Sequence, residues 1–366
     1  MWITATGGSG SSQALIEKGG EEVTLLRSLS AAKRRKSRTS LARSIRGRRV
    51  KMRGRARRGK RGSGRGKRIR KRRNLRGMRQ QSQELLLDLE SERQIAFEDG
   101  FRKGKYEGGE GFLAKLIPEH MILPDIPVEH VIALGFEQVR HLLQTLVDPA
   151  DIFIHMERAL ERKEPLSVVR LGDGELLALA HDRVLSSALV RKEAPFLGYA
   201  GMDIPDHEYR DQLAEAVRQA TFVGIPTSRM PNFQGLMYPT FRAYGMEVRH
   251  MRLTYSTVNY MLAQYGHLNR LLQGRRVLVI GNAAEALAHV FRSRGIAVAG
   301  VVTPVMGVRD THRVLAEAAT YDFDLALISA GIPAVLLTQR VASQFGKVAL
   351  DFGHLANKIA SGELGF

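Results

Sequence analysis

The carboxyl-terminal part of this 366-residue chain predicts an α/β fold built on a Rossmann-like, doubly wound parallel sheet. Short apolar segments of strand character occur at residues 166–170, 221–225, 276–280 and 324–328. Segments of helical length separate them, which indicates parallel strands joined by crossover helices rather than by hairpins. Such folds bind ligands beyond the carboxyl ends of the strands, so the residues that follow each strand are the first candidates for a site.

Two helices in this part begin with recognisable capping residues. Asp148 precedes Pro149, which places a capping carboxylate before the residue type that best tolerates the first helical turn. Asp206 begins a second helix, whose apolar residues from Tyr209 to Val217 recur at four-residue steps. Each of these helices precedes a predicted strand, as a βαβ arrangement requires.

Residues 275–351 show the alternation most clearly. Strand-like segments at 276–280, 296–302, 324–328 and 347–350 are separated by helical patterns. This regular alternation is typical of parallel βαβ units and supports the prediction of a doubly wound sheet.

The composition excludes several classes of chemistry. The chain has no cysteine, which excludes disulfides, cysteine-ligated zinc, cysteine-held iron–sulfur clusters and thiol catalysis. The first residues lack the apolar segment of a secretory signal, and no apolar run approaches the roughly 20 residues of a membrane span. We therefore expect a soluble, cytoplasmic protein with no transmembrane segment.

The positive charge of the chain is concentrated in one segment. Residues 33–79 contain 25 Lys and Arg and no Asp or Glu, and removing those 25 charges from the formal net charge of +19 leaves −6. Like-charge repulsion predicts a disordered tail over residues 1–80, then a linker or isolated helix at 81–113 and an α/β domain at 114–366. The tail suits contact with a polyanion, either nucleic acid or an anionic membrane or envelope polymer, and equally suits a solvated extension.

The most informative local pattern is the turn at residues 170–175, Arg-Leu-Gly-Asp-Gly-Glu, which directly follows the first predicted strand. Asp173 and Glu175 place two carboxylates at the carboxyl end of that strand, where a hard divalent cation can bridge phosphate oxygens. The alternative is an ordinary Gly-Asp-Gly turn, in which Glu175 only favours a helix N-terminus.

Further candidate residues follow other predicted strands. Asp351 and His354 come after the segment at 347–350, so they can share one cleft with the acidic turn. Ser228 and Arg229 lie in a polar loop after another strand, where they either contact a diphosphate or are simply solvated.

Several familiar sites are not expected. Residues 281–285 follow a strand but lack the G-x-G-x-x-G spacing, and Glu285 would repel a phosphate, so a nicotinamide-dependent redox enzyme is disfavoured. The chain also lacks G-x-x-x-x-G-K-[ST], G-x-S-x-G and H-E-x-x-H, the usual markers of P-loop hydrolases, α/β-hydrolases and zincins.

Two of these motifs together resemble a known family. The segment at 170–175 is similar to the R-[FL]-G-D-G-E signature of bacterial GT-D fold glycosyltransferases, which are distinguished by a DxE metal motif. The segment at 350–354, Leu-Asp-Phe-Gly-His, looks like the D-[IF]-G-H element of the same family. The resemblance covers roughly residues 150–360 and leaves the first 110 or so unexplained.

This resemblance implies a metal-dependent transfer of a hexose from a nucleotide sugar, a UDP-sugar in the first instance, to a saccharide or glycoprotein acceptor. Asp173 and Glu175 would bind Mn²⁺ or Mg²⁺ together with the donor diphosphate. Catalytic candidates are Asp173, Glu175 and His354, the last as base toward the acceptor hydroxyl; substrate-binding candidates are Arg170, Gly172, Gly174, Ser228, Arg229 and Asp351. The rival hypothesis is a non-catalytic nucleotide-fold protein that its basic tail anchors to a polyanion.

Overall fold

The computed structural model describes residues 64–365, which divide into two units between Ile132 and Ala133. The first unit contains helices α2 (Gly64–Gly108) and α3 (Glu110–Leu116). Helix α4 (Val128–Val139) spans the junction and continues into a short 3-10 helix, η1 (Arg140–Leu142). Among the residues that the structure describes, no helix is both long and apolar enough to cross a membrane.

The first described helix begins before residue 80, where the sequence predicts the end of the disordered tail. Residues 1–63, which make up most of the predicted tail, lie outside the described residues, but the backbone of residues 64–80 already belongs to α2. Lys and Arg are intrinsically good helix formers, so a basic segment adopts a helix when it extends a neighbouring one. For residues 81–113, predicted as a linker or an isolated helix, the structure contains α2 and α3.

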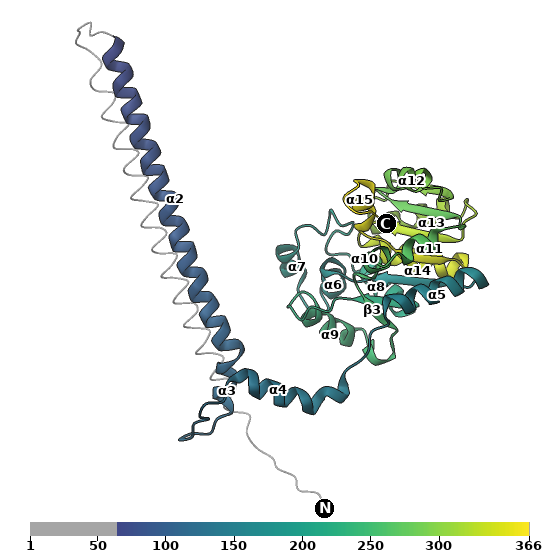
Figure 1. The fold of residues 1–366 in the computed structure, drawn as a ribbon, viewed down its shortest axis with the longest axis horizontal. Helices are drawn as coiled ribbons and strands as arrows, with labels where there is room; N and C mark the ends of the chain where they lie inside the picture. Colours follow the sequence, from purple (N-terminus) through teal and green to yellow (C-terminus); the bar gives the residue numbers. More distant parts are fainter. Residues whose placement is uncertain (1–63, 366) are drawn as a thin grey trace, which may run out of the picture. The chain divides into compact units, whose positions relative to one another are not determined.

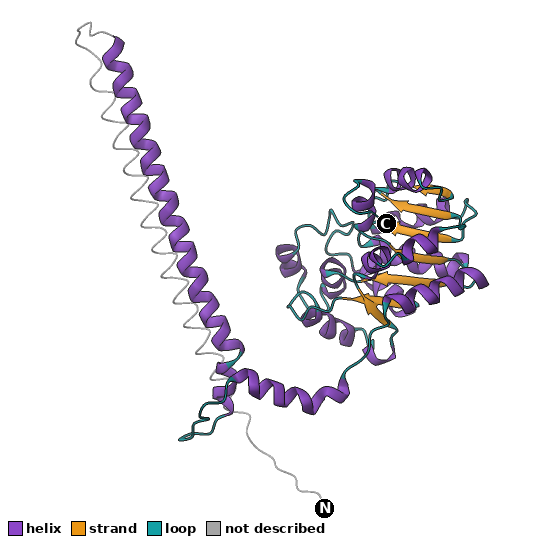
Figure 2. Ribbon diagram, in the orientation of Figure 1, coloured by secondary structure: helices purple, strands orange, loops and turns teal. Residues whose placement is uncertain are grey.

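The second unit is an α/β domain with a seven-stranded sheet in which every neighbouring pair is parallel. The strand order is β3-β2-β1-β7-β6-β4-β5. Figure 2 shows the strands as orange arrows between the helices. The strands are β1 (Leu166–Arg170), β2 (Phe222–Ile225), β3 (Leu253–Tyr255), β4 (Val277–Gly281), β5 (Val298–Val302), β6 (Leu325–Ser329) and β7 (Val348–Asp351).

Helices connect the strands and cover both faces of the sheet (Figure 1). They are α5 (Pro149–Arg162), α6 (Asp173–Ala180), α7 (Ser187–Glu193), α8 (His207–Gln219), α9 (Gln234–Ala243), α10 (Val258–Gln264), α11 (His267–Leu272), α12 (Ala284–Ser293), α13 (Thr311–Ala318), α14 (Pro333–Phe345) and α15 (Leu355–Ala360), with 3-10 helices η2 (Val248–His250) and η3 (Val308–Asp310). The expected doubly wound α/β fold is therefore confirmed.

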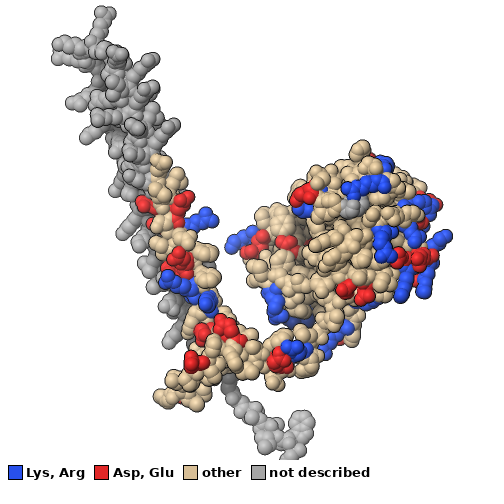
Figure 3. Space-filling model, viewed as in Figure 1, with Lys and Arg blue, Asp and Glu red and all other residues tan. Residues whose placement is uncertain are grey.

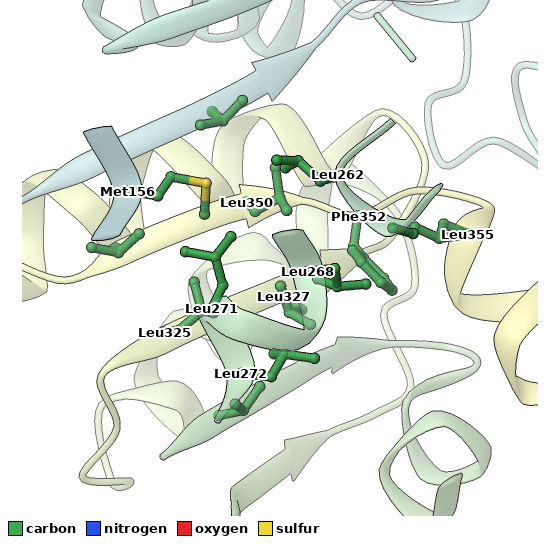
Figure 4. Packing of buried hydrophobic residues seen from close by; sticks show 14 of the residues in the cluster. Met156, Leu262, Leu268, Leu271, Leu272, Leu325, Leu327, Leu350, Phe352 and Leu355 are labelled. Carbon is green, nitrogen blue, oxygen red and sulfur yellow. The ribbon is translucent and has the colours of Figure 1, made fainter. Parts of the chain in front are cut away.

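The alternation of side chains along the strands explains why both faces are covered. In β1, Val168 packs into the cluster beneath α5, α10, α11 and α12, whereas Val169 packs into the opposite cluster with α6, α8 and α9. Figure 4 shows the first cluster, where Met156, Leu262 and Leu271 meet Leu350 of β7. Each such buried Leu or Met contributes roughly 1.5–3 kcal/mol relative to an exposed one.

The surface of the α/β unit carries both signs of charge. Lys and Arg are interspersed with Asp and Glu over the face seen in Figure 3. This mixture agrees with the small net charge that remains once the basic segment at 33–79 is set aside.

Capping at the two expected helix starts follows the sequence pattern. The Asp148 Oδ1 atom accepts a hydrogen bond from the N–H of Ala150 at 2.7 Å, and Asp206 Oδ1 accepts one from the N–H of Tyr209 at 3.3 Å. The predicted strands agree with the observed ones to within two residues at either end, while β3, only three residues long, was not predicted.

Candidate active site

The two motif-bearing segments leave neighbouring strands. Strands β1 and β7 pair in parallel, with Val168 opposite Leu350, although almost 180 residues separate them in sequence. The acidic turn at residues 170–175 and the segment at 351–354 therefore emerge side by side at the carboxyl edge of the sheet. From β1 the chain continues toward β2, whereas α15, which follows β7, contacts α12 on the other side. Such a divergence is where doubly wound sheets form a ligand crevice.

The acidic turn is held by hydrogen bonds from its own backbone. Glu175 Oε2 accepts from the N–H of Gly172 at 2.8 Å, and Asp173 Oδ1 accepts from the N–H of Gly174 at 3.0 Å. Both carboxylates are half-buried in the first turn of α6. Each therefore uses one oxygen to fix the turn, and Asp173 Oδ2 and Glu175 Oε1 remain for a ligand.

Arg170 ties the ends of three elements together. Its Nη2 donates to Asp351 Oδ1 at 3.0 Å and its Nε to the Asp351 carbonyl oxygen at 2.8 Å. Its Nη1 donates to the Ser256 carbonyl oxygen at 2.9 Å and to Asn259 Oδ1 at 3.3 Å. Asn259 in turn donates from Nδ2 to the Phe352 carbonyl oxygen at 2.8 Å. The guanidinium thus positions β7 and the start of α10 against β1, and its predicted contact with a diphosphate stays a prediction.

Gly353 permits this network. Its φ angle is +52°, and a Cβ atom there would lie 1.8 Å from Nη2 of Arg170. Only glycine adopts this backbone conformation at little cost and leaves room for the guanidinium.

Burial destabilises the ionised forms of two carboxylates at the turn, Glu175 and Asp351. Burial raises the pKa of Glu175 above its usual range, and the charge of Asp351 raises that pKa further. Burial also raises the pKa of Asp351, although the Arg170 guanidinium acts in the opposite direction. A cation beside Glu175 would relieve this destabilisation of the ionised form.

The donor set suits a hard divalent cation that completes its shell with a ligand. The available atoms are carboxylate oxygens, which Mg²⁺ and Mn²⁺ prefer. Within residues 64–365, no group of three or more His, Asp or Glu side chains is arranged as a metal cage. One or two carboxylates supplemented by phosphate oxygens and water are, however, a common Mg²⁺ site, so Asp173 and Glu175 fit such a metal.

The remaining predicted residues lie at the same edge but are more exposed. Ser228 and Arg229 are in the exposed loop after β2, which pairs with β1 on the side away from β7. The Ser228 hydroxyl accepts from the N–H of Met230 at 3.3 Å, which shapes the loop. His354 is exposed at the N-cap of α15. The structure thus brings Arg170, Asp351 and Glu175 into one cluster and places the loop and the histidine on its two sides.

Sequence reasoning missed Ser256 and Asn259, which hold Arg170 from a third element. Asn259 is the one strongly polar residue in the otherwise apolar-rich helix segment Val258–Ala263, and it is fully buried. A buried amide in such a segment requires a hydrogen-bond partner, which is the only signal that the sequence offered.

Fold and site together define a doubly wound α/β protein with a cluster of charged side chains at the carboxyl edge of its sheet, where β1 and β7 end. The chain belongs to the family of GT-D fold-like domains, whose family model matches residues 147–359. The resemblance seen in the two motifs is thereby confirmed.

Two solved structures are similar in fold. One is domain of unknown function 1792, described as having a distinct glycosyltransferase fold, with 15% sequence identity and a TM-score of 0.42 over 60% of this chain and 81% of that chain. The other is a selenomethionine-substituted structure of domain of unknown function 1792, with 17% identity and a TM-score of 0.42 over 62% of this chain and 85% of that one. No curated protein matches the chain.

Proposed function

We propose that this protein is a glycosyltransferase that moves a hexose from a nucleotide sugar, a UDP-sugar in the first instance, to a saccharide or glycoprotein acceptor. One observation carries the proposal: in a GT-D fold-like domain, Asp173 and Glu175 follow the carboxyl end of β1, and the neighbouring strand β7 ends in the buried Asp351, whose charge acts on Glu175. Charge of this kind at a strand end suits a cation-bound diphosphate.

The acidic turn holds the divalent cation through Asp173 and Glu175. When bound, Mn²⁺ or Mg²⁺ supplies positive charge to the leaving diphosphate as the sugar–phosphate bond breaks. Gly172 and Gly174 contribute as backbone: a Cβ at Gly172 would lie 3.0 Å from Glu175 Oε2, so glycine there lets the carboxylate fold back onto the turn.

The side chains on either side of the turn complete the site. Arg229 adds a second positive charge toward the diphosphate from the loop after β2, and Ser228 adds a hydroxyl. His354 accepts the proton of the acceptor hydroxyl from its exposed position after β7. Arg170 and Asp351 position the site rather than contact the substrate, because their mutual contact fixes the strand ends from which these groups project.

A donor screen tests the proposal directly. The full chain is incubated with Mn²⁺ and a panel of nucleotide sugars, and the release of free nucleotide is measured with and without a chelator. We expect release from at least one donor, abolished by chelation, and lowered roughly 10²- to 10³-fold by Asp173→Asn or Glu175→Gln, a loss typical of removing charge stabilisation from a transition state.

The matched control is Glu285→Gln. Glu285 is an exposed carboxylate in the first turn of α12, the helix that follows β4 as α6 follows β1, and its variant is expected to keep wild-type activity. Calorimetry supplies the second readout: undiminished metal-dependent UDP-sugar binding by Asp173→Ala/Glu175→Ala would overturn the assigned roles. If no donor releases nucleotide and only a polyanion binds the chain, the non-catalytic hypothesis replaces the transferase.

A further inference from the structure

The segment at residues 194–206, called the edge strap here, connects α7 to α8 and follows the carboxyl edge of the sheet. The Ala200 carbonyl oxygen accepts a hydrogen bond from the N–H of Ile332 at 3.0 Å, and the Gly201 carbonyl oxygen accepts one from the N–H of Val308 at 2.7 Å. Ile332 follows β6 and Val308 follows β5. The strap is therefore anchored to two loops on the far side of β7.

Glycines bring these backbones into contact. A Cβ atom at Gly331 would lie 2.4 Å from the Ala200 carbonyl oxygen, and one at Gly307 would lie 2.7 Å from the Gly201 carbonyl oxygen. Both glycines have positive φ angles, +63° and +100°, which other residues rarely adopt. The strap is consequently packed backbone against backbone, which fixes the directions of the side chains that it carries.

The other end of the strap rests on the acidic turn. The ideal Cβ position of Gly174 lies 3.5 Å from Cε2 of Phe196 and 3.8 Å from Cδ2 of Leu197. Leu197 is buried in the same cluster as Leu176 of α6. The strap thus runs from the turn after β1 to the loops after β6 and β5. Strand β7, which lies between β1 and β6, ends between these anchor points.

The first nine residues of the strap carry two exposed aromatic side chains and no charge, and the exposed Asp203 follows them. Residues 194–202 contain no Lys, Arg, Asp or Glu, while Phe196 is 41% and Tyr199 is 96% exposed. The loop after β2, on the opposite side of β1, instead presents the exposed Arg229. Because a diphosphate requires positive charge, the donor phosphates belong on the β2 side. The apolar C–H face of a neutral sugar ring suits the aromatic side.

We propose that Phe196 and Tyr199 form the acceptor-binding platform, on which the ring of the acceptor saccharide stacks beside the acidic turn. This inference rests on the proposed glycosyltransferase function and adds to it the place and the chemistry of acceptor recognition. It also assigns a purpose to the glycine contacts of the strap, since a stacking surface must be held rigidly to discriminate between sugars.

Two measurements on the full chain test the platform. Saturation-transfer NMR with methyl glucoside, methyl galactoside and methyl N-acetylglucosaminide measures binding of neutral sugar rings. Nucleotide release in the absence of any acceptor measures use of the donor. We expect Phe196→Ala and Tyr199→Ala each to weaken binding of the preferred methyl glycoside about three- to tenfold, the worth of one aromatic contact, while nucleotide release changes less than about twofold.

The matched control is Tyr265→Ala. Tyr265 is a 56% exposed tyrosine at the opposite end of α10, away from the carboxyl edge, and its variant is expected to bind sugars as the wild type does. Tyr199 is almost fully exposed, so its removal leaves the fold intact and keeps the test decisive.

Three results would overturn the platform: no binding of any methyl glycoside by the wild type, unchanged binding by both strap variants, or a loss of donor use with acceptor binding intact. A different result separates the two proposals. If the strap variants lose methyl glycoside binding but the wild type releases nucleotide from no donor, the platform stands as a sugar site and the transferase function fails.

Discussion

The Arg170 guanidinium lies 3.0 Å from the Asp351 carboxylate, with both side chains largely buried at the carboxyl ends of two adjacent strands. The pair joins segments that are far apart in sequence and sets the spacing between the acidic turn and the β7 loop. Buried charges are expensive to desolvate, so each partner depends on the other. The same contact therefore governs the stability of the domain and the shape of its site.

Arg170→Met is expected to destabilise the domain by about 3–5 kcal/mol, because it leaves the buried carboxylate of Asp351 without its cation. Arg170→Lys should recover only part of this loss, since the three donors of an ammonium group sit on one nitrogen and cannot reproduce the guanidinium fork that spans Asp351, Ser256 and Asn259. Urea unfolding followed by circular dichroism measures both changes.

The control for this pair is Lys358→Met, which breaks the exposed ion pair between Lys358 and Glu363. Surface ion pairs contribute about 0–1 kcal/mol, so this variant should unfold almost as the wild type does. Equal losses in Arg170→Met and Lys358→Met would show that the Arg170 network does not stabilise the fold.

Gly353→Ala is expected to destabilise the domain strongly, because its Cβ would overlap Nη2 of Arg170 and the chain there has a φ angle of +52°. Gly346→Ala provides the comparison: it has a φ angle of +66° but no atom within 4 Å of the added Cβ. The comparison variant should lose only about 1 kcal/mol of unfolding free energy from backbone strain. A similar loss in both variants, measured by thermal unfolding, would remove the steric role assigned to Gly353.

The sequence was sufficient for the fold class because βαβ alternation is a local pattern. Strand β1 was predicted with its observed bounds, and the placement of Asp351 beside the acidic turn followed from the rule that parallel strands share one carboxyl edge. Strand β3 was missed because three residues, Leu253–Tyr255, carry too little periodicity to be recognised.

The partners of the site residues were not predictable in the same way. Arg170 looked like a free phosphate ligand, and only the pairing of β1 with β7 and the position of α10 show that Asp351 and Asn259 engage it. The contacts of the strap were also not predictable, because nothing in the sequence shows that the loops containing Gly201 and Gly331 approach other backbone segments. These contacts depend on tertiary packing, which a single sequence does not encode locally.

Glu175→Gln is expected to raise the melting temperature at pH 7 while removing metal binding. Because the pKa of Glu175 is raised in the folded protein, ionisation of this carboxyl costs stability as the pH rises through the interval above its usual pKa of about 4.3. The variant avoids that cost, so its advantage should be present at pH 7 and vanish near pH 4, where the wild-type carboxyl is protonated.

Differential scanning calorimetry with and without Mn²⁺ measures both effects of this variant. The cation should stabilise the wild type and leave Glu175→Gln unchanged, because a ligand stabilises only the protein that binds it. The exposed carboxylate variant Glu285→Gln should respond to Mn²⁺ as the wild type does. A Glu175→Gln protein that is less stable at pH 7 than at pH 4, relative to the wild type, would contradict the assigned pKa direction.

The buried His181 is expected to make the domain less stable below about pH 6.5. Its Nδ1 donates to the Ala178 carbonyl oxygen at 2.5 Å and its Nε2 accepts from the N–H of Asp206 at 3.2 Å, so the ring is neutral. Burial lowers its pKa, chiefly by desolvation.

Protons therefore bind the unfolded histidine first as the pH falls through 6.5, and stability declines by at most about 1.4 kcal/mol per pH unit until the folded ring also titrates. Urea unfolding between pH 8 and pH 5 should show a shallower decline in His181→Asn than in the wild type, whereas His289→Asn, which removes an exposed histidine, should keep the wild-type slope; identical slopes in all three proteins would contradict a neutral, buried His181.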